Sequence, residues 1–339
     1  MPSNVNTYGD ISPRTAAYAA KELLRRGQPT AILEKFGYFD PQGSNKTKTR
    51  TWRRYEPLQP ATTPLVEGHT PVGQKLRYTD YEATLQQYGD YIELTDVIYD
   101  THEDPVLNQS LDLCAQQIVE TTELIRFAAI KGGTNVYYAN NVASRLLVSS
   151  APLRGDLRKI YRGFKRNRAS EISEVIKAST EVSTEPVKRS YVLIGHTDLD
   201  SDVRNMTGFI SAEKYSMMKM IADCEIGSAE HFRVCLTEMF EPWLAAATSA
   251  SGSTYLTNGA AGTGFPDVYP MLAIAKDSYA IVPLAGRNVV KPAVHNPQPV
   301  PGDELGQRGF VSWKMWQAAA ILQDAWLARY EVAATANPV

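Results

Sequence analysis

The strongest periodic pattern of the chain lies between residues 105 and 131. Apolar side chains recur there at helical intervals of three, four or seven; they are Leu107, Leu111, Cys114, Ile118, Ile125 and Ala129. Asp104-Pro105 supplies an N-cap acceptor and a first-turn proline, and Gly132-Gly133 ends the pattern. The segment predicts one helix about 40 Å long. Its opposite face is polar and is expected near solvent or a partner; it carries Asn108, Gln109, Asp112, Gln116, Glu120 and Glu123.

Residues 51–99 have a composition typical of β-strands. Runs rich in Tyr, Thr, Leu and Ile extend from Leu76 to Leu85 and from Tyr91 to Ile98. The half before them is interrupted by prolines, which central strands exclude; these are Pro57, Pro60, Pro64 and Pro71. The pattern predicts a long two-stranded excursion whose stem joins a sheet. Because a lone hairpin is marginal in water, this excursion needs a neighbour.

The first 50 residues are polar and interrupted. A short helical pattern covers Thr15–Arg26, an apolar patch covers Ala31–Phe36, and loop residues follow at Pro41–Lys46. Such a segment buries little apolar surface by itself. It is expected to form an arm that becomes ordered by lying across another surface.

From Leu153 to the region of Gly309, helical and strand patterns alternate as in an α+β domain. They predict a basic helix at Asp156–Arg168 and a capped turn entering a helix at Asp198–Asn205. Buried strands are predicted at Tyr191–Ile194, Phe232–Leu236 and Tyr269–Ala275.

The end of the chain changes character twice. The uncharged small-residue tract 245–264 is expected to be a surface loop, and the proline-rich segment Pro292–Pro301 is expected to lead out of the α+β domain. The last block, Phe310–Val332, is apolar and aromatic. It predicts a strand pair that returns to the core.

Composition narrows the function classes only a little. The chain has 339 residues, 43% of them hydrophobic, enough for a core divided over about two domains. Its 35 basic and 37 acidic residues give a net charge of -2, whereas proteins that grip nucleic acid usually carry a basic excess. The balance suits a container that holds DNA without adhering to it, and an ordinary enzyme equally. A polar N-terminus and no apolar run near about 18 residues predict a soluble cytoplasmic protein with no membrane partner.

No catalytic, cofactor or metal site is predicted. The sequence lacks the GxSxG, GxxxxGK(S/T), GxGxxG and HExxH patterns, and its five histidines are scattered. Asp198–Asp202 resembles the start of a calcium loop, but Val203 replaces the required glycine and Phe209 the closing glutamate. The cysteines have no CxxC spacing and are interpreted as buried or incidental thiols; they are Cys114, Cys224 and Cys235.

Two clusters of charge are candidates for contacts with partners. Trp52–Tyr55 (WRRY) lies beside Lys46 and Lys48 and would suit an acidic partner. A basic run follows the helix near residues 156–168; it comprises Arg154, Arg158, Lys159, Arg162, Lys165, Arg166 and Arg168. This run would suit DNA, but a solvated face or pairing with acidic groups of a neighbouring subunit is the preferred interpretation.

Six segments carry a resemblance to a known family. They are Thr49–Pro64 (TRTWRRYEPLQPATTP), Leu85–Pro105 (LQQYGDYIELTDVIYDTHEDP), Lys131–Tyr138 (KGGTNVYY), Gly195–Asp202 (GHTDLDSD), Tyr269–Leu284 (YPMLAIAKDSYAIVPL) and Leu305–Val332 (LGQRGFVSWKMWQAAAILQDAWLARYEV). In this order they resemble the major capsid proteins of tailed bacteriophages in the group typified by coliphage N-four. The resemblance runs from about Arg14 to Val332, nearly the whole chain.

This resemblance implies a Hong Kong 97-like capsid fold of the α+β class. The layout it implies is an N-terminal arm at 1–50, an extended loop (E-loop) at 51–95, a peripheral (P) domain at 96–149 with a spine helix at 105–131, an axial (A) domain at 150–305, and C-terminal strands of the P domain at 306–339. Hinges are expected at the base of the E-loop and at Gly132-Gly133.

The function implied is self-assembly into hexamers and pentamers of an icosahedral phage head that encloses double-stranded DNA, in a virion assembled in the host cytoplasm. Expected partners are copies of the chain itself, a separate scaffolding protein because no room for a scaffolding segment precedes Arg14, a portal protein, and a decoration protein as an optional addition. DNA is enclosed without sequence-specific binding, and no cofactor or enzymatic activity is expected. Candidate assembly-interface residues are Arg53, Arg54, Tyr55, Glu56, Glu67, Lys75, Arg77, Arg158, Arg162 and Arg166.

Three alternatives stay open at this point. A bacterial nanocompartment shell (encapsulin-like) shares the fold, and the nucleic-acid content of purified particles would separate it from a phage head. An α+β enzyme without a recognisable motif would give a small stable oligomer with a deep polar pocket. A DNA-binding protein is disfavoured by the sequence pI of 6.3 and would show salt-dependent binding by free subunits.

Overall fold

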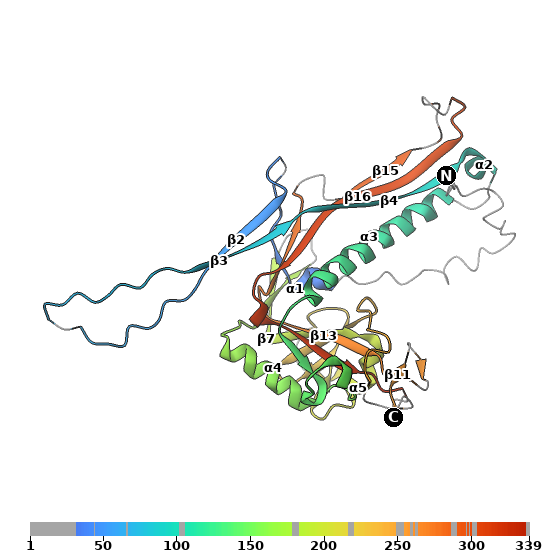
Figure 1. Ribbon diagram of the computed structural model, residues 1–339. Helices are drawn as coiled ribbons and strands as arrows, with labels where there is room; N and C mark the ends of the chain where they lie inside the picture. Colours follow the sequence, from blue (N-terminus) through green and yellow to red (C-terminus); the bar gives the residue numbers. More distant parts are fainter. Residues whose placement is uncertain are drawn as a thin grey trace.

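Two sheets, one long helix and a projecting hairpin make up the fold (Figure 1). The structure is a computed structural model that describes residues 32–336, with short gaps at 44, 66, 102–105, 178–182, 216–219, 249–253, 258–259, 262–263, 286–289, 296, 298 and 300–303. The helical patch predicted at Thr15–Arg26 and the N-cap predicted at Asp104-Pro105 lie outside the described residues.

Helix α3 (Val106–Lys131) confirms the long helix expected at 105–131. It lies along β16 (Arg308–Ile321) and β4 (Gln86–Thr95), as Figure 1 shows. The apolar stripe identified in the sequence is the packed one; it meets the sheet through Cys114, Ile118 and Ile125 against Val311, Trp313 and Met315. The polar ring nitrogen of Trp313 in this contact is also satisfied, because it donates to Gln117 Oε1 at 2.8 Å.

Strand β16 organises the five-stranded sheet beside this helix. Its C-terminal half pairs with β14 (Tyr279–Pro283), and its N-terminal half pairs with β15 (Val290–His295). On the other side it pairs with β4 over ten residue pairs, from Arg308↔Thr95 to Gln317↔Gln86. The short β1 (Tyr38–Phe39) adds in parallel to β14.

The second sheet has eight strands in the order β5-β17-β13-β7-β10-β9-β8, with β6 paired to β7. Its strands are β5 (Val136–Tyr138), β6 (Ile172–Lys177), β7 (Ser183–His196), β8 (Phe209–Ser211), β9 (Glu225–Ala229), β10 (Phe232–Thr237), β13 (Val268–Ile274) and β17 (Leu327–Ala333). The three buried strands predicted from the sequence are therefore confirmed as parts of β7, β10 and β13. Every residue of β10 and β13 is buried, because the sheet is covered on both faces.

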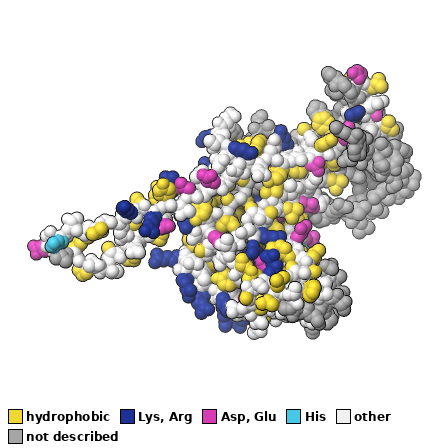
Figure 2. Space-filling view, in the orientation of Figure 1, with side chains coloured by type: hydrophobic (Ala, Val, Ile, Leu, Met, Phe, Trp, Pro, Cys, Tyr) yellow, Lys and Arg dark blue, Asp and Glu magenta, His cyan; other side chains and the backbone are white. Residues whose placement is uncertain are grey.

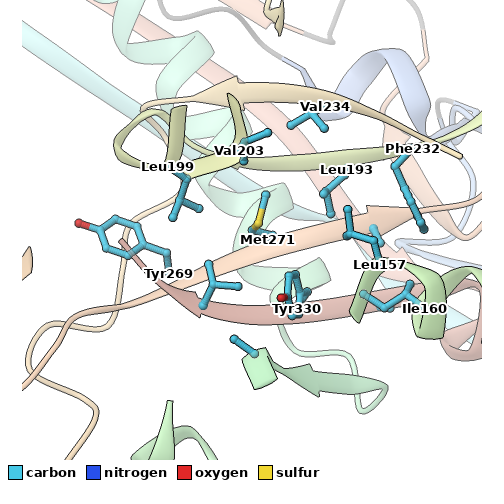
Figure 3. Close-up of a cluster of buried hydrophobic side chains, with 14 of the residues drawn as sticks. Leu157, Ile160, Leu193, Leu199, Val203, Phe232, Val234, Tyr269, Met271 and Tyr330 are labelled. Atoms are coloured by element: carbon cyan, nitrogen blue, oxygen red, sulfur yellow. The ribbon is translucent and has the colours of Figure 1, made fainter. Parts of the chain in front are cut away.

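Side chains on opposite faces of this sheet enter two separate cores. Along β7, Tyr191 and Leu193 enter the first core, whereas Val192 and Ile194 enter the second, as the two-residue period of a strand requires. Helix α4 (Arg154–Arg166) covers the first core with Leu157 and Ile160, and Figure 3 shows these side chains facing Leu193, Phe232 and Tyr330. The second core is closed by Phe127 and Ile130 of α3 and by α1 (Leu33–Phe36).

The remaining elements are short. They are the hairpin strands β2 (Thr49–Tyr55) and β3 (Tyr78–Thr84), helices α2 (Asp96–Thr101) and α5 (Asp200–Arg204), strands β11 (Leu256–Thr257) and β12 (Ala260–Ala261), and the 3-10 turns η2 (Ala139–Asn141), η3 (Arg145–Leu147), η4 (Thr197–Leu199), η5 (Ala212–Lys214) and η6 (Asp324–Trp326). The capped turn predicted at Asp198–Asn205 is confirmed by η4 and α5.

Three local predictions need correction. The strand expected at Tyr91–Ile98 begins earlier and stops at Thr95, because the Asp96 carboxylate accepts from Val97 N at 2.8 Å and starts α2. The tract 245–264, expected to be a loop, contains the small ladder β11–β12. The start of the segment Pro292–Pro301 lies in β15, a position that a sheet-edge strand allows to proline.

The two sheets exchange strands across the boundary predicted at residue 305. Strands β14 and β15 precede that boundary yet pair with β16, and β17 follows it yet lies between β5 and β13. The expected strand pair in Phe310–Val332 is therefore two strands in two different sheets. The division into P and A domains stays a prediction.

A buried carboxylate joins the end of α3 to the eight-stranded sheet. Glu331 is fully buried and accepts two hydrogen bonds from Arg145, at 2.7 and 2.8 Å, and one from Arg329 at 2.8 Å. Arg329 also donates to the carbonyl of Lys131, the last residue of α3. Arg329 therefore caps the end of α3, and both guanidinium groups neutralise the buried carboxylate.

Glu331→Ala is expected to lower the free energy of unfolding by about 3 kcal/mol, because it leaves two arginines without their buried counter-ion. Guanidinium unfolding of the isolated subunit measures this. Arg204→Ala is the control, since its ion pair with Asp200 is nearly half exposed on both sides and should cost less than about 0.5 kcal/mol. Equal costs for the two variants would contradict the role assigned to Glu331.

Candidate assembly surfaces

The hairpin formed by β2 and β3 projects from the body (Figure 1). Its ladder runs from Thr49↔Thr84 to Tyr55↔Tyr78. Beyond the ladder, Glu56 N donates to Arg77 O at 2.9 Å, and the Gln74 side chain closes a two-way contact with the Gln59 backbone at 2.9 and 2.8 Å. The described residues between Glu56 and Arg77 form no strand or helix and are all exposed.

The base of the hairpin is fastened to the body. Asp40 accepts a two-pronged contact from Arg50, at 2.9 Å for each nitrogen, and a third bond from Trp52 Nε1 at 2.7 Å. Ala83 and Leu85 pack into a small core against Val282 and Ala318 of the five-stranded sheet. The hairpin is therefore anchored at one end only.

Beyond Arg50 and Trp52, charged and aromatic residues of the hairpin contact one another. Arg53 donates to Asp80 through two nitrogens, at 2.8 and 2.9 Å, and its guanidinium lies 4.1 Å from the centre of the Tyr78 ring. These hydrogen bonds lower the pKa of the Asp80 carboxyl and raise that of Arg53. Tyr55 and Tyr78 meet edge to face at 6.3 Å. The pairs rigidify the stem while keeping charge on its surface.

Seven of the ten predicted interface residues lie on this hairpin: Arg53, Arg54, Tyr55, Glu56, Glu67, Lys75 and Arg77. The prediction from charge missed the apolar side chains between them. These are among the most exposed apolar residues of the described chain; they are Leu58 (56%), Leu65 (78%), Val72 (97%) and Leu76 (67%). The signal was available, because apolar residues in a proline-rich excursion have no sheet to pack against.

The other three predicted residues form a separate surface on α4. Arg158, Arg162 and Arg166 follow one another at intervals of four and are all exposed. Arg158 shares Glu230 with Arg154, at 3.0 Å for Arg158, and lowers the pKa of that carboxyl together with Arg154. Among the residues that the structure describes, no carboxylate lies within ion-pair distance of Arg162 or Arg166. Figure 2 shows Lys and Arg side chains gathered over this helix, away from the hairpin.

The arm segment next to the hairpin is buried in its own subunit. Ile32, Leu33 and Phe36 enter the second core, so the patch predicted at Ala31–Phe36 packs inward, in contrast to the expectation that the arm buries little by itself. The Tyr279 hydroxyl also donates to the Leu33 carbonyl at 2.5 Å. The described end of the arm is therefore an integral part of the body.

Glu123 is the residue of α3 that binds this segment. Its face of the helix was expected near solvent or a partner, but this side chain is buried against the arm segment of its own chain. The side chain is 1% exposed and Oε1 accepts from Ile32 N at 3.0 Å and from Leu33 N at 2.9 Å. One turn away, Arg126 donates to Glu34 at 3.0 Å and, with the Gln317 amide turned to accept, to Gln317 at 2.8 Å. The Glu123 carboxylate supplies the acceptor that two buried backbone N–H groups of the arm segment require.

Burial raises the pKa of the Glu123 carboxyl. The backbone N–H groups of Leu33 and Ile32 and the charge of Arg126 oppose this shift, and Glu34 adds to it. Glu123 Oε2 is buried without a hydrogen-bond partner among the described residues. The charged form is therefore incompletely compensated in the folded protein.

The described residues hold no group of three or more His, Cys, Asp and Glu side chains arranged for a metal ion. No helix in the described part of the chain combines the length and apolar character needed to cross a bilayer.

Comparison with known proteins supports the fold. No family model matches the sequence, and no curated protein matches it either. Among solved structures, the capsid of cyanophage Pam1 matches with a TM-score of 0.62 and 12% identity over 99% of this chain and 100% of that one. The capsid of Ralstonia phage GP4 matches with 0.61 and 10% over 98% of both chains, and the head of Helicobacter pylori bacteriophage KHP40 with 0.61 and 11% over 87% of both. The chain has the fold of these phage capsid chains, the Hong Kong 97-like α+β fold that the sequence predicted.

Glu123→Gln is expected to change how stability depends on pH. A raised folded-state pKa means that the folded protein binds the proton more readily than the unfolded chain, so the wild type gains stability as the pH falls from the raised pKa towards the ordinary value of 4.5. The variant lacks this proton and lacks the gain. Denaturant unfolding of both proteins between pH 7 and 5 measures the difference in their free energies of unfolding. The other carboxyls are the same in both proteins, so their contributions cancel.

Glu120→Gln is the matched control, because Glu120 lies on the same helix, is only partly buried and contacts Gln116 at 2.8 Å. A wild-type advantage over Glu123→Gln that stays constant with pH would contradict the incomplete compensation of the Glu123 charge.

Proposed function

We propose that the chain is the major capsid protein of a tailed-phage head, a structural subunit that self-assembles and has no enzymatic activity. The observation that carries the proposal is the hairpin of β2 and β3. It is anchored at its base, projects from the body and exposes apolar side chains. Exposed apolar clusters on such an excursion are typical of a surface that binds a partner. Because the solved structures compared above are phage capsid and head structures with this fold, a copy of the same chain is the natural partner.

Burial of the apolar hairpin side chains on a neighbouring subunit would stabilise the contact. Covering one exposed leucine or valine side chain contributes about 1.5–3 kcal/mol, so the four apolar residues between Leu58 and Leu76 supply enough to hold the hairpin on a second subunit. Each subunit both lends a hairpin and receives one. The summed interface would reach about 2,000–5,000 Å², the class of obligate assemblies.

Charged residues give the contact its register. In the proposal, Arg54, Glu56, Glu67, Lys75 and Arg77 on the hairpin, and Arg158, Arg162 and Arg166 on α4, pair with opposite charges of neighbouring subunits. Such pairs at the rim of an interface set orientation and salt dependence more than affinity. The near-neutral chain, with a net charge of -2, suits a shell that encloses double-stranded DNA without sequence-specific binding.

Within this proposal the segments take capsid roles. The projecting hairpin serves as the E-loop, α3 and the five-stranded sheet as the P domain, and the eight-stranded sheet as the A domain around which hexamers and pentamers form. The proposed further partners are a separate scaffolding protein, a portal protein and a decoration protein, and the mature subunit resides in the virion.

Replacing the four apolar side chains by serine (Leu58, Leu65, Val72 and Leu76→Ser) is expected to reduce the yield of closed shells at least about tenfold, because the change removes the buried area that holds the hairpin on its neighbour. Sedimentation and electron microscopy measure the yield. The free energy of unfolding of the free subunit should change by less than about 0.5 kcal/mol, since these side chains are exposed.

Thr62→Ser with Thr63→Ser is the matched control, because both threonines are exposed on the same loop and keep their polarity. Full shell yield from the apolar quadruple variant would sink the proposed role of the hairpin, while loss of yield in the threonine control would point to a general effect of changing the loop.

Expression of the chain alone is expected to give few or irregular shells, because a separate scaffolding protein would guide their curvature. Co-expression with the neighbouring genes of its source genome should restore uniform particles in electron micrographs. Uniform closed shells from the chain alone would contradict the need for a separate scaffold.

A further inference from the structure

Two of the three cysteines meet where β9 and β10 begin to separate. Cys224 directly precedes β9, and Cys235 lies in β10 opposite Glu225, at an irregularity of the ladder. The backbone closes this point, because Leu236 N donates to Cys224 O at 3.1 Å. Cys224 therefore lies diagonally across the ladder from Cys235.

Both side chains lie on the same face of the eight-stranded sheet. Cys235 belongs to the second core and is fully buried, while Cys224 packs against that core and keeps part of its surface open to solvent. Because both thiols face this core from neighbouring positions of one ladder, an interaction between them accounts for the opposite shifts of their pKa values. The two thiols are thus neighbours on one face of the sheet, one partly open to solvent and one fully buried.

The surroundings give the two thiols different reactivity. The interaction with Cys235 lowers the pKa of Cys224, and the ammonium group of Lys35 in α1 lowers it further against the effect of burial. The pKa of Cys235 is raised well above its usual range by the interaction with Cys224 and by burial. Cys224 is therefore the more readily ionised thiol, and it is also the one that solvent reaches.

The third cysteine offers an internal comparison. Cys114 is buried between α3 and the five-stranded sheet, in a core with no second cysteine. Burial raises its pKa. Among the described residues, no cation lowers the pKa of Cys114 and no second thiol lies in its core, so the pair differs from it in both properties.

We infer that Cys224 and Cys235 form an oxidation site at which a hydroperoxide converts the thiol pair into an intramolecular disulfide. The Cys224 thiolate attacks the peroxide oxygen, giving a sulfenic acid and one water once the released hydroxide is protonated. The Cys235 thiol then displaces the hydroxyl group from Cys224, forming the S–S bond and a second water. Two thiols lose two hydrogens and two electrons, and the peroxide takes them up.

The site has a consequence that rests on the proposed function. A subunit assembled in a reducing cytoplasm would keep both thiols, whereas a released particle meets an oxidising medium. The new bond would then link the start of β9 to β10 beside α1, where the arm enters its own core. It would fasten this edge of the sheet after assembly is complete.

The test uses the full-length free subunit, treated with hydrogen peroxide near neutral pH. Remaining thiols are alkylated in denaturant and counted by mass spectrometry. The expected product has lost two hydrogens, keeps one alkylatable cysteine, identified as Cys114, and yields a linked peptide pair carrying Cys224 and Cys235. A thiol reductant should restore all three alkylatable cysteines.

Variants separate the roles of the two sulfurs. Cys235→Ser should leave a sulfenic acid on Cys224 that a dimedone probe captures, and Cys224→Ser should leave Cys235 reduced. Lys35→Gln should slow the reaction of Cys224 about two- to fivefold, whereas Lys35→Arg should restore the rate, because the rate follows the thiolate fraction.

Oxidation of Cys224 and Cys114 at equal rates, or oxidation of Cys224 to sulfinic acid alone in the wild type, would overturn the inference. The measurement needs no assembled particle, so a negative result leaves the proposed capsid function untouched. Failure of the subunit to form shells leaves the chemistry of the thiol pair equally untouched.

Discussion

The arrangement of the two sheets depends on two connecting segments, which cross from one sheet to the other and are hydrogen-bonded to each other. The chain passes from β13 to β14 through residues 275–278, and from β16 to β17 through residues 322–326. The Ser278 carbonyl accepts from Leu322 N at 2.9 Å and from Gln323 N at 3.1 Å, and Ala275 N donates to Trp326 O at 3.1 Å. Because one crossing satisfies the backbone of the other, neither sheet can turn without breaking both.

The long helix is fastened to the same point. Thr134, just beyond α3, donates its backbone N–H to Asp324 in the second crossing at 3.0 Å, and Arg329 holds the last carbonyls of the helix. Gly132-Gly133 therefore ends the helix beside several hydrogen bonds, and the hinge expected at these glycines stays a prediction. At the other side of α3, Glu123 binds the arm segment, so that helix, arm and both sheets form one body.

The sequence predicted the parts of the fold whose signal is local. The apolar stripe of α3 and the buried runs of β7, β10 and β13 follow from side-chain periods that any neighbouring surface would satisfy. The sequence did not predict which sheet receives β17, because its apolar run suits either one and pairing is decided by residues far along the chain.

The same limit explains the site residues. A glutamate on the polar face of a helix is expected to face solvent. Glu123 is buried because it accepts hydrogen bonds from the backbone N–H groups of Ile32 and Leu33, some ninety residues earlier in the chain. On the hairpin, charge pointed to the segment that the structure shows projecting from the body, but not to the exposed apolar side chains on which the proposed contact rests. Their exposure is a property of the finished fold, since it depends on how far the loop lies from the described part of the body.

In the shell proposed above, one chain would occupy several slightly different surroundings, and a single rigid body would leave few places to absorb the differences. The hairpin base is held by Asp40 and by packing against Val282, and the hinge expected at this base stays a prediction. Beyond Tyr55↔Tyr78 the two sides of the loop are connected by the Glu56–Arg77 backbone bond and the Gln59–Gln74 contact, both fully exposed. Local opening costs least where buried contacts are fewest. The distal loop, which carries the apolar side chains, is therefore the part best suited to follow a neighbour whose angle changes, while the base keeps it attached.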